Sequence, residues 1–247
     1  MISKSQISFI KSLHQKKIRK EQGLFIVEGL KSIQEFINSE YLFDSVYCTE
    51  NLMLKLDNLS RKIKPVIISE SELSRISTLS TPQAILAVVQ IPKHTEINIK
   101  NLDRSFFLAL DGVQDPGNLG TIIRTADWFG LNTILCSMDT AEVYNPKVVQ
   151  ASMGSLSRVN IIYTDLGVLF SQINIPVYGA LLDGKSIYET DFGQAGIVLL
   201  GNEGNGISKE LLEKINYPIT IPRFGKAESL NVAISASIFC SELRRKT

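Results

Sequence analysis

Side chains that could hold a ligand gather in three glycine-rich stretches that all lie beyond residue 109 of the 247-residue chain. The stretches are LDGVQDPGNLGTIIRTADWFG at 110–130, VLLGNEGNGIS at 198–208 and IPRFGKAESLNVAIS at 221–235. They supply amide, hydroxyl, carboxylate and guanidinium groups, which bind by hydrogen bonds and charge. Each stretch begins with or follows an apolar run and ends where a helix could begin. Gly-rich loops at strand ends are where α/β proteins usually build a ligand site, so we expect one composite site.

Imidazoles and thiols take no part in these stretches. His14 and His94 lie far from them, and Cys48, Cys136 and Cys240 are widely spaced beside apolar residues. This spacing favours buried free thiols over a disulfide or a metal site. We therefore expect neither a bound metal nor a Ser-His-Asp triad.

The polar residues of the stretches also have simpler interpretations. Asn118 could cap the helix that starts in the first stretch, and Ser229 or Asn231 could cap the C-terminal helix. Arg124 points away from the apolar face of its predicted helix, where a surface ion pair is an alternative role. Glu203 lies among glycines, although a glycine turn alone would need no carboxylate.

Strands alternating with helices position these stretches. Apolar runs of Ile, Leu and Val between amphipathic segments predict an α/β fold with a parallel sheet flanked by helices. The polar segment 93–105 is the best linker, so we expect a small N-terminal α/β domain over 1–92 and a second domain over 106–247. The expected strands are 25–29, 45–49, 65–69, 84–91, 106–112, 132–137, 158–163, 176–182, 196–201 and 217–222.

Composition indicates a soluble chain with one uneven charge feature. Hydrophobic residues make up 44% of the sequence and the net charge is +1. No apolar run reaches the roughly 18–20 residues of a membrane span, and the N-terminus does not resemble a signal peptide, so we expect a cytoplasmic protein without a membrane partner. The first 31 residues carry an excess of Lys and Arg. Lys16, Lys17, Arg19 and Lys20 form either a solvated helix face or a patch that contacts nucleic-acid phosphates.

The segment GALLDGKS at 179–186 fits the letters of a phosphate-binding P-loop. A P-loop needs a flexible loop followed directly by a helix. Here Ala180, Leu181 and Leu182 continue a predicted strand, and the residues after Ser186 have weak helical periodicity. A nucleoside triphosphatase is therefore the less favoured alternative, and Lys185→Ala would test it.

The ordered motifs NLGTIIRTA, LLGNEG and SLNVA resemble the three signature motifs of the SpoU (TrmH-type) RNA ribose 2′-O-methyltransferases of the SPOUT class. NPKVVQASMGSLSRV at 145–159 resembles the segment between the first two motifs. GLFIVEGLKSIQEFI at 23–37 resembles the start of the ribosomal-protein-like substrate-binding domain of that family. The resemblance covers nearly the whole chain.

The resemblance implies a deep trefoil knot near residues 196–247 and a homodimer whose active site draws on both subunits. It implies S-adenosylmethionine as the cofactor and RNA, favouring ribosomal RNA and not DNA, as the substrate. Two sets of residues match the positions of the family. The cofactor would be held by Leu181, Gly201, Ile221 and Leu230, and the catalytic positions are Asn118, Arg124, Glu203, Ser229 and Asn231.

The family proposal makes the arginine, here Arg124, a general base, but a guanidinium seldom gives up its proton. We therefore prefer Arg124 as a ligand of the target phosphate that orients the 2′-hydroxyl, with a phosphate oxygen or a water accepting the proton. Two further interpretations stay open. The chain could methylate transfer RNA instead, or bind RNA without catalysis as a ribosome-assembly factor.

Overall fold

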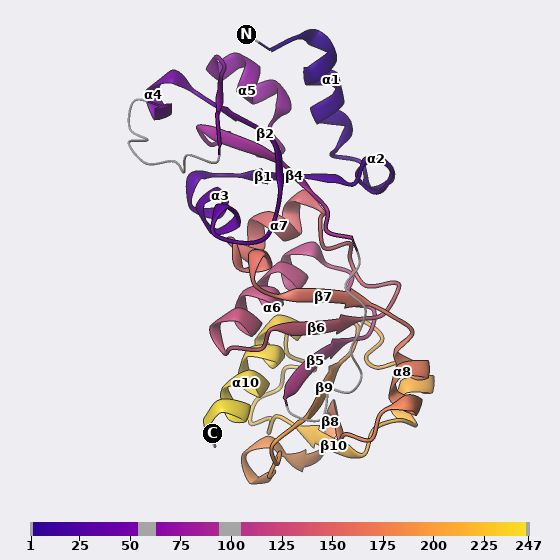
Figure 1. Cartoon of the computed structure of the whole chain (residues 1–247). Helices are drawn as coiled ribbons and strands as arrows, with labels where there is room; N and C mark the ends of the chain where they lie inside the picture. The colour runs from indigo at the N-terminus through magenta and orange to yellow at the C-terminus, as the bar shows by residue number, and fades with distance from the viewer. Residues whose placement is uncertain (1, 54–62, 94–104, 246–247) are drawn as a thin grey trace. The chain divides into compact units, whose positions relative to one another are not determined.

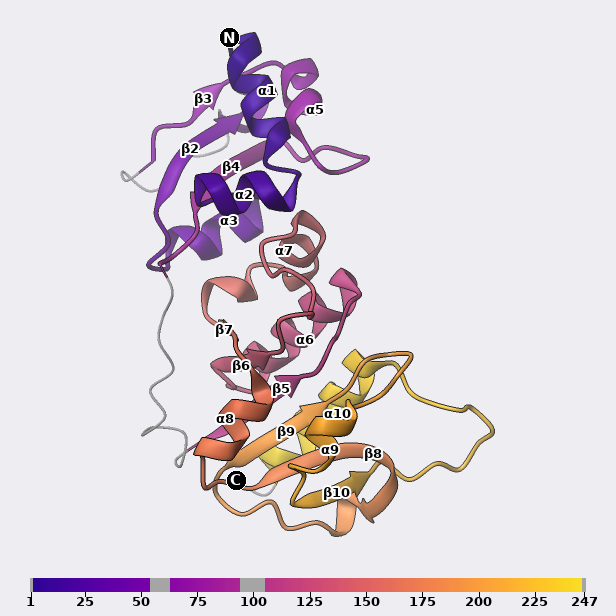
Figure 2. The same cartoon turned by 90° about the vertical axis from the view of Figure 1, so that its right-hand side faces the viewer.

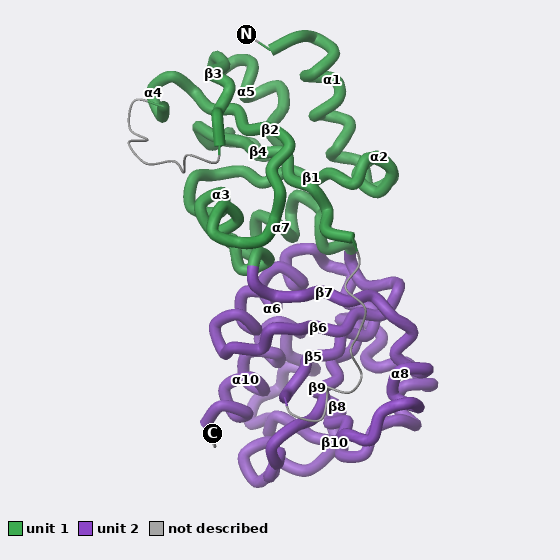
Figure 3. The backbone as a smooth tube through the Cα atoms, in the orientation of Figure 1, with its two compact units in different colours: residues 1–94, 142–157 green, residues 95–141, 158–247 purple. Residues whose placement is uncertain are grey.

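The computed structural model describes residues 2–53, 63–93 and 105–245, which fold into two compact units (Figure 3). Unit 1 comprises residues 1–94 and 142–157, and unit 2 comprises residues 95–141 and 158–247. Most of the predicted linker 93–105 lies outside the described residues. Residues 142–157 were expected in the second domain, over 106–247. In the structure they belong to unit 1.

Unit 1 is built on a four-stranded sheet in the order β1-β4-β2-β3. Its strands agree with those expected from the apolar runs, but β4 runs antiparallel to β1 and β2, while β2 and β3 are parallel. The sheet of unit 1 is therefore mixed, and only that of unit 2 is fully parallel. The strands are β1 (Leu24–Glu28), β2 (Phe43–Cys48), β3 (Val66–Ile67) and β4 (Ile85–Gln90).

Two helices of unit 1 begin at serine caps. Ser3 caps α1 and Ser69 caps α5, each in a capping box with the residue three positions later. Ile7 and Ile10 of α1 are buried in one cluster with Leu73 of α5. The helices are α1 (Lys4–Ser12), α2 (Lys16–Gln22), α3 (Leu30–Ile37), α4 (Glu50–Met53), α5 (Glu70–Ile76) and α7 (Pro146–Ser152).

Helix α7 explains why the segment 142–157 belongs to unit 1. Val148 and Val149 are buried, and α7 packs against β1. Burying such side chains stabilises the folded state by about 1.5–3 kcal/mol each. The apolar face of α7 therefore forms part of the core of unit 1.

Unit 2 contains a six-stranded sheet in the order β10-β8-β9-β5-β6-β7. Every pair of neighbours in it is parallel, as the apolar runs between helices predict. The strands are β5 (Phe106–Leu110), β6 (Thr133–Cys136), β7 (Asn160–Tyr163), β8 (Val177–Ser186), β9 (Gly196–Leu200) and β10 (Tyr217–Thr220).

Helices cover both faces of this sheet (Figure 1). Helices α6 (Pro116–Trp128) and α10 (Val232–Arg245) pack against each other on one face. On the other face, α8 (Leu166–Gln172) and α9 (Lys209–Leu212) contribute leucines to a cluster with β5 and β9. The sheet is thus buried on both sides, and its strand ends are the positions open to a ligand.

The three cysteines are free and buried, as predicted. Burial raises the pKa of the Cys240 thiol to about 12 and also raises the pKa values of Cys48 and Cys136. No helix in the described part of the chain is long and apolar enough to cross a membrane.

Candidate functional site

Two of the glycine-rich stretches meet where β5 and β9 end. These strands are parallel neighbours, and Asp111 and Gly201 follow their last residues. The Asp111 carboxylate, only 8% exposed, accepts the backbone N–H of Ser208 at 2.7 Å. Asn202 Nδ2 donates to the carbonyl oxygen of Gly112 at 2.6 Å. Sequence reasoning gave Asp111 and Asn202 no role, although both lie within two residues of the end of an apolar strand in the stretches it singled out.

A chain of side-chain hydrogen bonds joins all three stretches. Asn118 Nδ2 donates to Glu203 Oε1 at 2.9 Å, and Asn231 Nδ2 donates to Asn118 Oδ1 at 2.9 Å. The sequence placed these three residues together only through the family resemblance. The structure brings them into direct contact, and we call them the amide cluster.

The helix caps at this site differ in part from the expected ones. Asp115 caps α6 by accepting the backbone N–H of Asn118 at 2.8 Å, so the predicted capping role of the Asn118 side chain is wrong. Asn231 does cap α10, since its Oδ1 accepts the backbone N–H of Ala233 at 2.8 Å. Because Asp115 satisfies the start of α6, the Asn118 amide is left for contacts between the stretches.

Arg124 lies on the exposed side of α6, about one and two-thirds turns beyond Asn118. Leu119, Ile122 and Ile123 are fully buried on the opposite side of the same helix. This arrangement agrees with the predicted apolar face. It directs the Arg124 guanidinium away from the core of unit 2.

Glycines let the backbone fold tightly beside the amide cluster. A Cβ added to Gly201 would overlap the backbone of Gly206 and Ile207, so a side chain at 201 would displace this turn. Gly206 has φ +70°, a conformation that favours glycine. The result is a loop of exposed backbone at the end of β9.

The positions expected to hold the cofactor lie mostly near the carboxyl-terminal ends of three neighbouring strands of the sheet. Gly201 and Ile221 directly follow β9 and β10, and β8 lies between these two strands. The Thr220 hydroxyl donates to the carbonyl oxygen of Leu182 at 2.9 Å, which ties β10 to β8 next to Leu181. Ser229 and Leu230 lie in the exposed loop that leads to α10.

The P-loop interpretation of GALLDGKS is wrong. These residues lie on β8, and Lys185 is in register with Ile219 on β10. A short 3-10 helix at Ile187–Glu189 follows, instead of a helix that could bind phosphate at its N-terminus. Among the described residues, no cluster of His, Cys, Asp or Glu could hold a metal ion.

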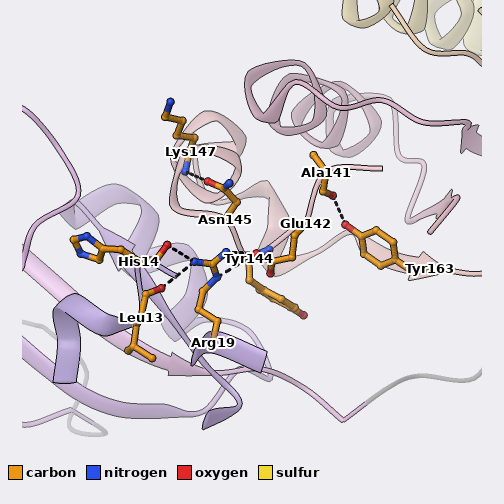
Figure 4. Close-up of polar contacts among 9 residues, drawn as sticks. All are labelled: Leu13, His14, Arg19, Ala141, Glu142, Tyr144, Asn145, Lys147 and Tyr163. Atoms are coloured by element: carbon orange, nitrogen blue, oxygen red, sulfur yellow. Dashed lines mark hydrogen bonds and ion pairs between the residues drawn. The ribbon is translucent and has the colours of Figure 1, made fainter. Parts of the chain in front are cut away.

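The predicted basic patch is wrong at Arg19, which is not available to a ligand. Its side chain is only 2% exposed and pairs with Glu142 inside unit 1 (Figure 4). Its Nη1 also donates to the carbonyl oxygens of Leu13 at 2.9 Å and His14 at 2.8 Å. A guanidinium bound in this way cannot contact RNA, whereas Lys16, Lys17 and Lys20 are exposed.

This fold and motif arrangement places the protein among the RNA-modifying α/β methylases. Residues 105–241 match the model of the SpoU rRNA Methylase family, and residues 4–87 match that of the MRM3-like substrate binding domain. The chain belongs to the SpoU rRNA methylase family.

Curated relatives extend over most of the chain. It is 33% identical over 238 residues to the 23S rRNA (guanosine(2553)-2′-O)-methyltransferase RlmP of Bacillus subtilis, covering 95% of this chain and 94% of that protein. It is 29% identical to the 23S rRNA (guanosine-2′-O-)-methyltransferase RlmB of Neisseria meningitidis serogroup B, covering 87% of this chain and 88% of the relative.

Solved structures share the whole fold. A protein of the TrmH family from Porphyromonas gingivalis is 42% identical, with a TM-score of 0.88 over 100% of both chains. An AdoMet-bound rRNA methyltransferase from Sinorhizobium meliloti is 27% identical, with a TM-score of 0.86 over 100% of this chain and 97% of that one.

Proposed function

We propose that the protein transfers a methyl group from S-adenosylmethionine to a ribose 2′-hydroxyl of ribosomal RNA. The observation that carries this proposal is the amide cluster, which joins the three family motifs in the order Glu203, Asn118, Asn231. Family membership and the named activities of RlmP and RlmB support the substrate class.

The carboxyl-terminal ends of β8, β9 and β10 in unit 2 have the backbone geometry that a cofactor site needs. Gly201 leaves backbone exposed where a Cβ would overlap the following turn, which suits close approach of a nucleoside. Leu181, Gly201, Ile221 and Leu230 would hold S-adenosylmethionine. When bound there, the cofactor supplies an electrophilic methyl group.

Arg124 and the amide cluster handle the RNA. The exposed Arg124 guanidinium binds a phosphate of the target nucleotide, since its planar fork matches phosphate oxygens. Asn118, Ser229 and Asn231 hold the ribose by hydrogen bonds. Glu203 accepts from Asn118 and so fixes which way that amide points.

The 2′-hydroxyl proton leaves to a phosphate oxygen or to a water molecule. No imidazole lies in the three motifs, and a guanidinium retains its proton. Arg124 therefore acts by orienting the hydroxyl, and such positioning can supply several kcal/mol of rate acceleration.

Unit 1 supplies affinity for the RNA. The exposed Lys16, Lys17 and Lys20 contact phosphates without reading sequence. The match to a substrate-binding domain over residues 4–87 supports this role. We assign RNA binding to residues 1–92 and methyl transfer to residues 106–247. Within the latter range, residues 142–157 pack in unit 1.

Two finer features belong to the same proposal. A trefoil knot near residues 196–247 would shape the cofactor site, and a homodimer in the cytoplasm would be the working form. Both features follow from the resemblance of the three motifs to the family, and the similarity of fold to a TrmH-family structure supports that family membership. The mass of the purified protein in solution tests the dimer.

Ribose-methylation mapping of total RNA tests the function directly. RNA from a deletion strain is compared with RNA from its parent, and we expect one methylated ribose in ribosomal RNA to be lost. A lost site in transfer RNA would favour the alternative substrate. If no site is lost and calorimetry detects no S-adenosylmethionine binding with or without RNA, the protein is a non-catalytic assembly factor.

A further inference from the structure

Phe224 is the most exposed large apolar side chain in the described part of the chain. Its exposed fraction is 96%, whereas Phe25, Phe36 and Phe239 are buried in cores. It lies in the loop between β10 and α10, which extends away from the sheet (Figure 2). A ring so exposed gives the fold almost no stabilisation, because burial is what makes apolar side chains stabilising.

The loop that carries Phe224 is anchored at the candidate site. At its end, Asn231 donates to Asn118 and caps α10. At its start, Thr220 of β10 donates to the carbonyl oxygen of Leu182. Phe224 lies seven positions before Asn231, in the same loop as Ser229 and Asn231, the residues proposed to bind the ribose.

The residues beside Phe224 have the charge that suits nucleic acid. Arg223 precedes the ring and Lys226 follows it closely, while Glu228 is the only acidic residue of the loop. Arg223 donates to the carbonyl oxygen of Ala227 at 3.3 Å, which ties the guanidinium to the backbone of this loop. Single-strand binding sites combine an aromatic face for a base with cations for the backbone.

We propose that Phe224 stacks on a base of the RNA next to the methylated ribose, with Arg223 and Lys226 contacting its phosphates. This proposal rests on the proposed function and adds the residue that recognises the base. Stacking tolerates any base because each has a π-face. A protein-binding anchor is the less favoured occupant, since the immediate neighbours of Phe224 are a cation and a glycine, not an apolar patch.

Three variants of the full-length protein test the proposal on an unmodified transcript of the site found by mapping. With saturating S-adenosylmethionine, Phe224→Ala should raise the KM for RNA by about 5-fold or more, the effect of losing one stacked base. Phe224→Trp should keep a KM near that of the native protein. Phe224→Leu, which is apolar but has no ring face, should resemble the alanine variant.

Each other outcome has a definite meaning. The stacking role would be overturned if Phe224→Ala left the KM for RNA unchanged, or if Phe224→Leu had the same KM for RNA as the native protein. A raised Kd for S-adenosylmethionine by calorimetry would instead make Phe224 a cover for the cofactor, and a changed mass in solution would make it a subunit contact. If the native protein methylates no RNA, the proposed function itself fails.

Discussion

Unit 1 and unit 2 each use hydrogen bonds between residues distant in sequence, but in opposite ways. In unit 1, the buried Arg19 guanidinium pairs with Glu142, whose side chain is 19% exposed. In unit 2, Asn118 joins Glu203 and Asn231 in an exposed cluster. A buried guanidinium cannot leave its carboxylate for a ligand without a large desolvation cost, whereas exposed amides exchange partners easily. Burial, more than residue type, therefore separates the structural contact from the site.

Breaking the buried pair should have the largest effect. We expect Glu142→Ala to destabilise unit 1 by roughly 3 kcal/mol, because it leaves the Arg19 charge buried without its carboxylate. Cys48 is buried in unit 1, while Cys136 and Cys240 are buried in unit 2. Thiol labelling followed by mass spectrometry should therefore show faster reaction of Cys48 alone.

The double variant Arg19→Met with Glu142→Leu is the control for this test. It removes both charges and keeps apolar volume, so it should recover much of the lost stability. Equal acceleration at all three cysteines would show that the pair does not act on unit 1 in particular.

Removing the exposed arginine should affect turnover and not stability. We expect Arg124→Ala to lower kcat/KM about 100-fold, or roughly 2.7 kcal/mol of transition-state stabilisation, with an unchanged unfolding midpoint. Arg124→Lys keeps the charge but loses the paired N–H donors of the guanidinium, so its kcat/KM should remain well below that of the native protein. Near-native turnover of the lysine variant would remove the need for a guanidinium.

Breaking a hydrogen bond of the amide cluster should have an intermediate effect on turnover. Asn118→Asp places a carboxylate against Glu203, which costs a hydrogen bond and adds repulsion, so kcat should fall about 10-fold. Adding Glu203→Gln restores a donor to that contact and should recover part of kcat. Methyl-transfer rates at saturating RNA measure both. No recovery in the double variant would assign Glu203 a role beyond holding Asn118.

The lysines of unit 1 should have the smallest effect on the reaction. We expect alanine at Lys16, Lys17 and Lys20 to weaken RNA binding with kcat unchanged. The slope of log affinity against log salt should decrease by about 2 to 3, because each lost phosphate contact contributes about 0.7–0.9. Lys31→Ala, on an exposed position of α3, is the control. An unchanged salt slope would move the RNA-binding surface elsewhere.

Sequence alone predicted the strands and the meeting of the motifs, but not which polar side chains are buried. Runs of Ile, Leu and Val identify buried strands because burial on both faces leaves little choice of residue. Lys16, Lys17, Arg19 and Lys20 look alike as letters, and only tertiary packing shows that Arg19 faces inward. In the same way, Asp115 and Asn118 are both good helix caps, and backbone geometry selected Asp115.

The return of residues 142–157 to unit 1 has a consequence for dividing the molecule. A single cut near residue 94 would leave Val148 and Val149 on the fragment that lacks β1, their packing partner. Their apolar surface would then face water and promote aggregation. If unit 1 binds the RNA as proposed, its exchange between relatives must move two separate segments together, which ties substrate choice to a helix encoded within the methylase sequence.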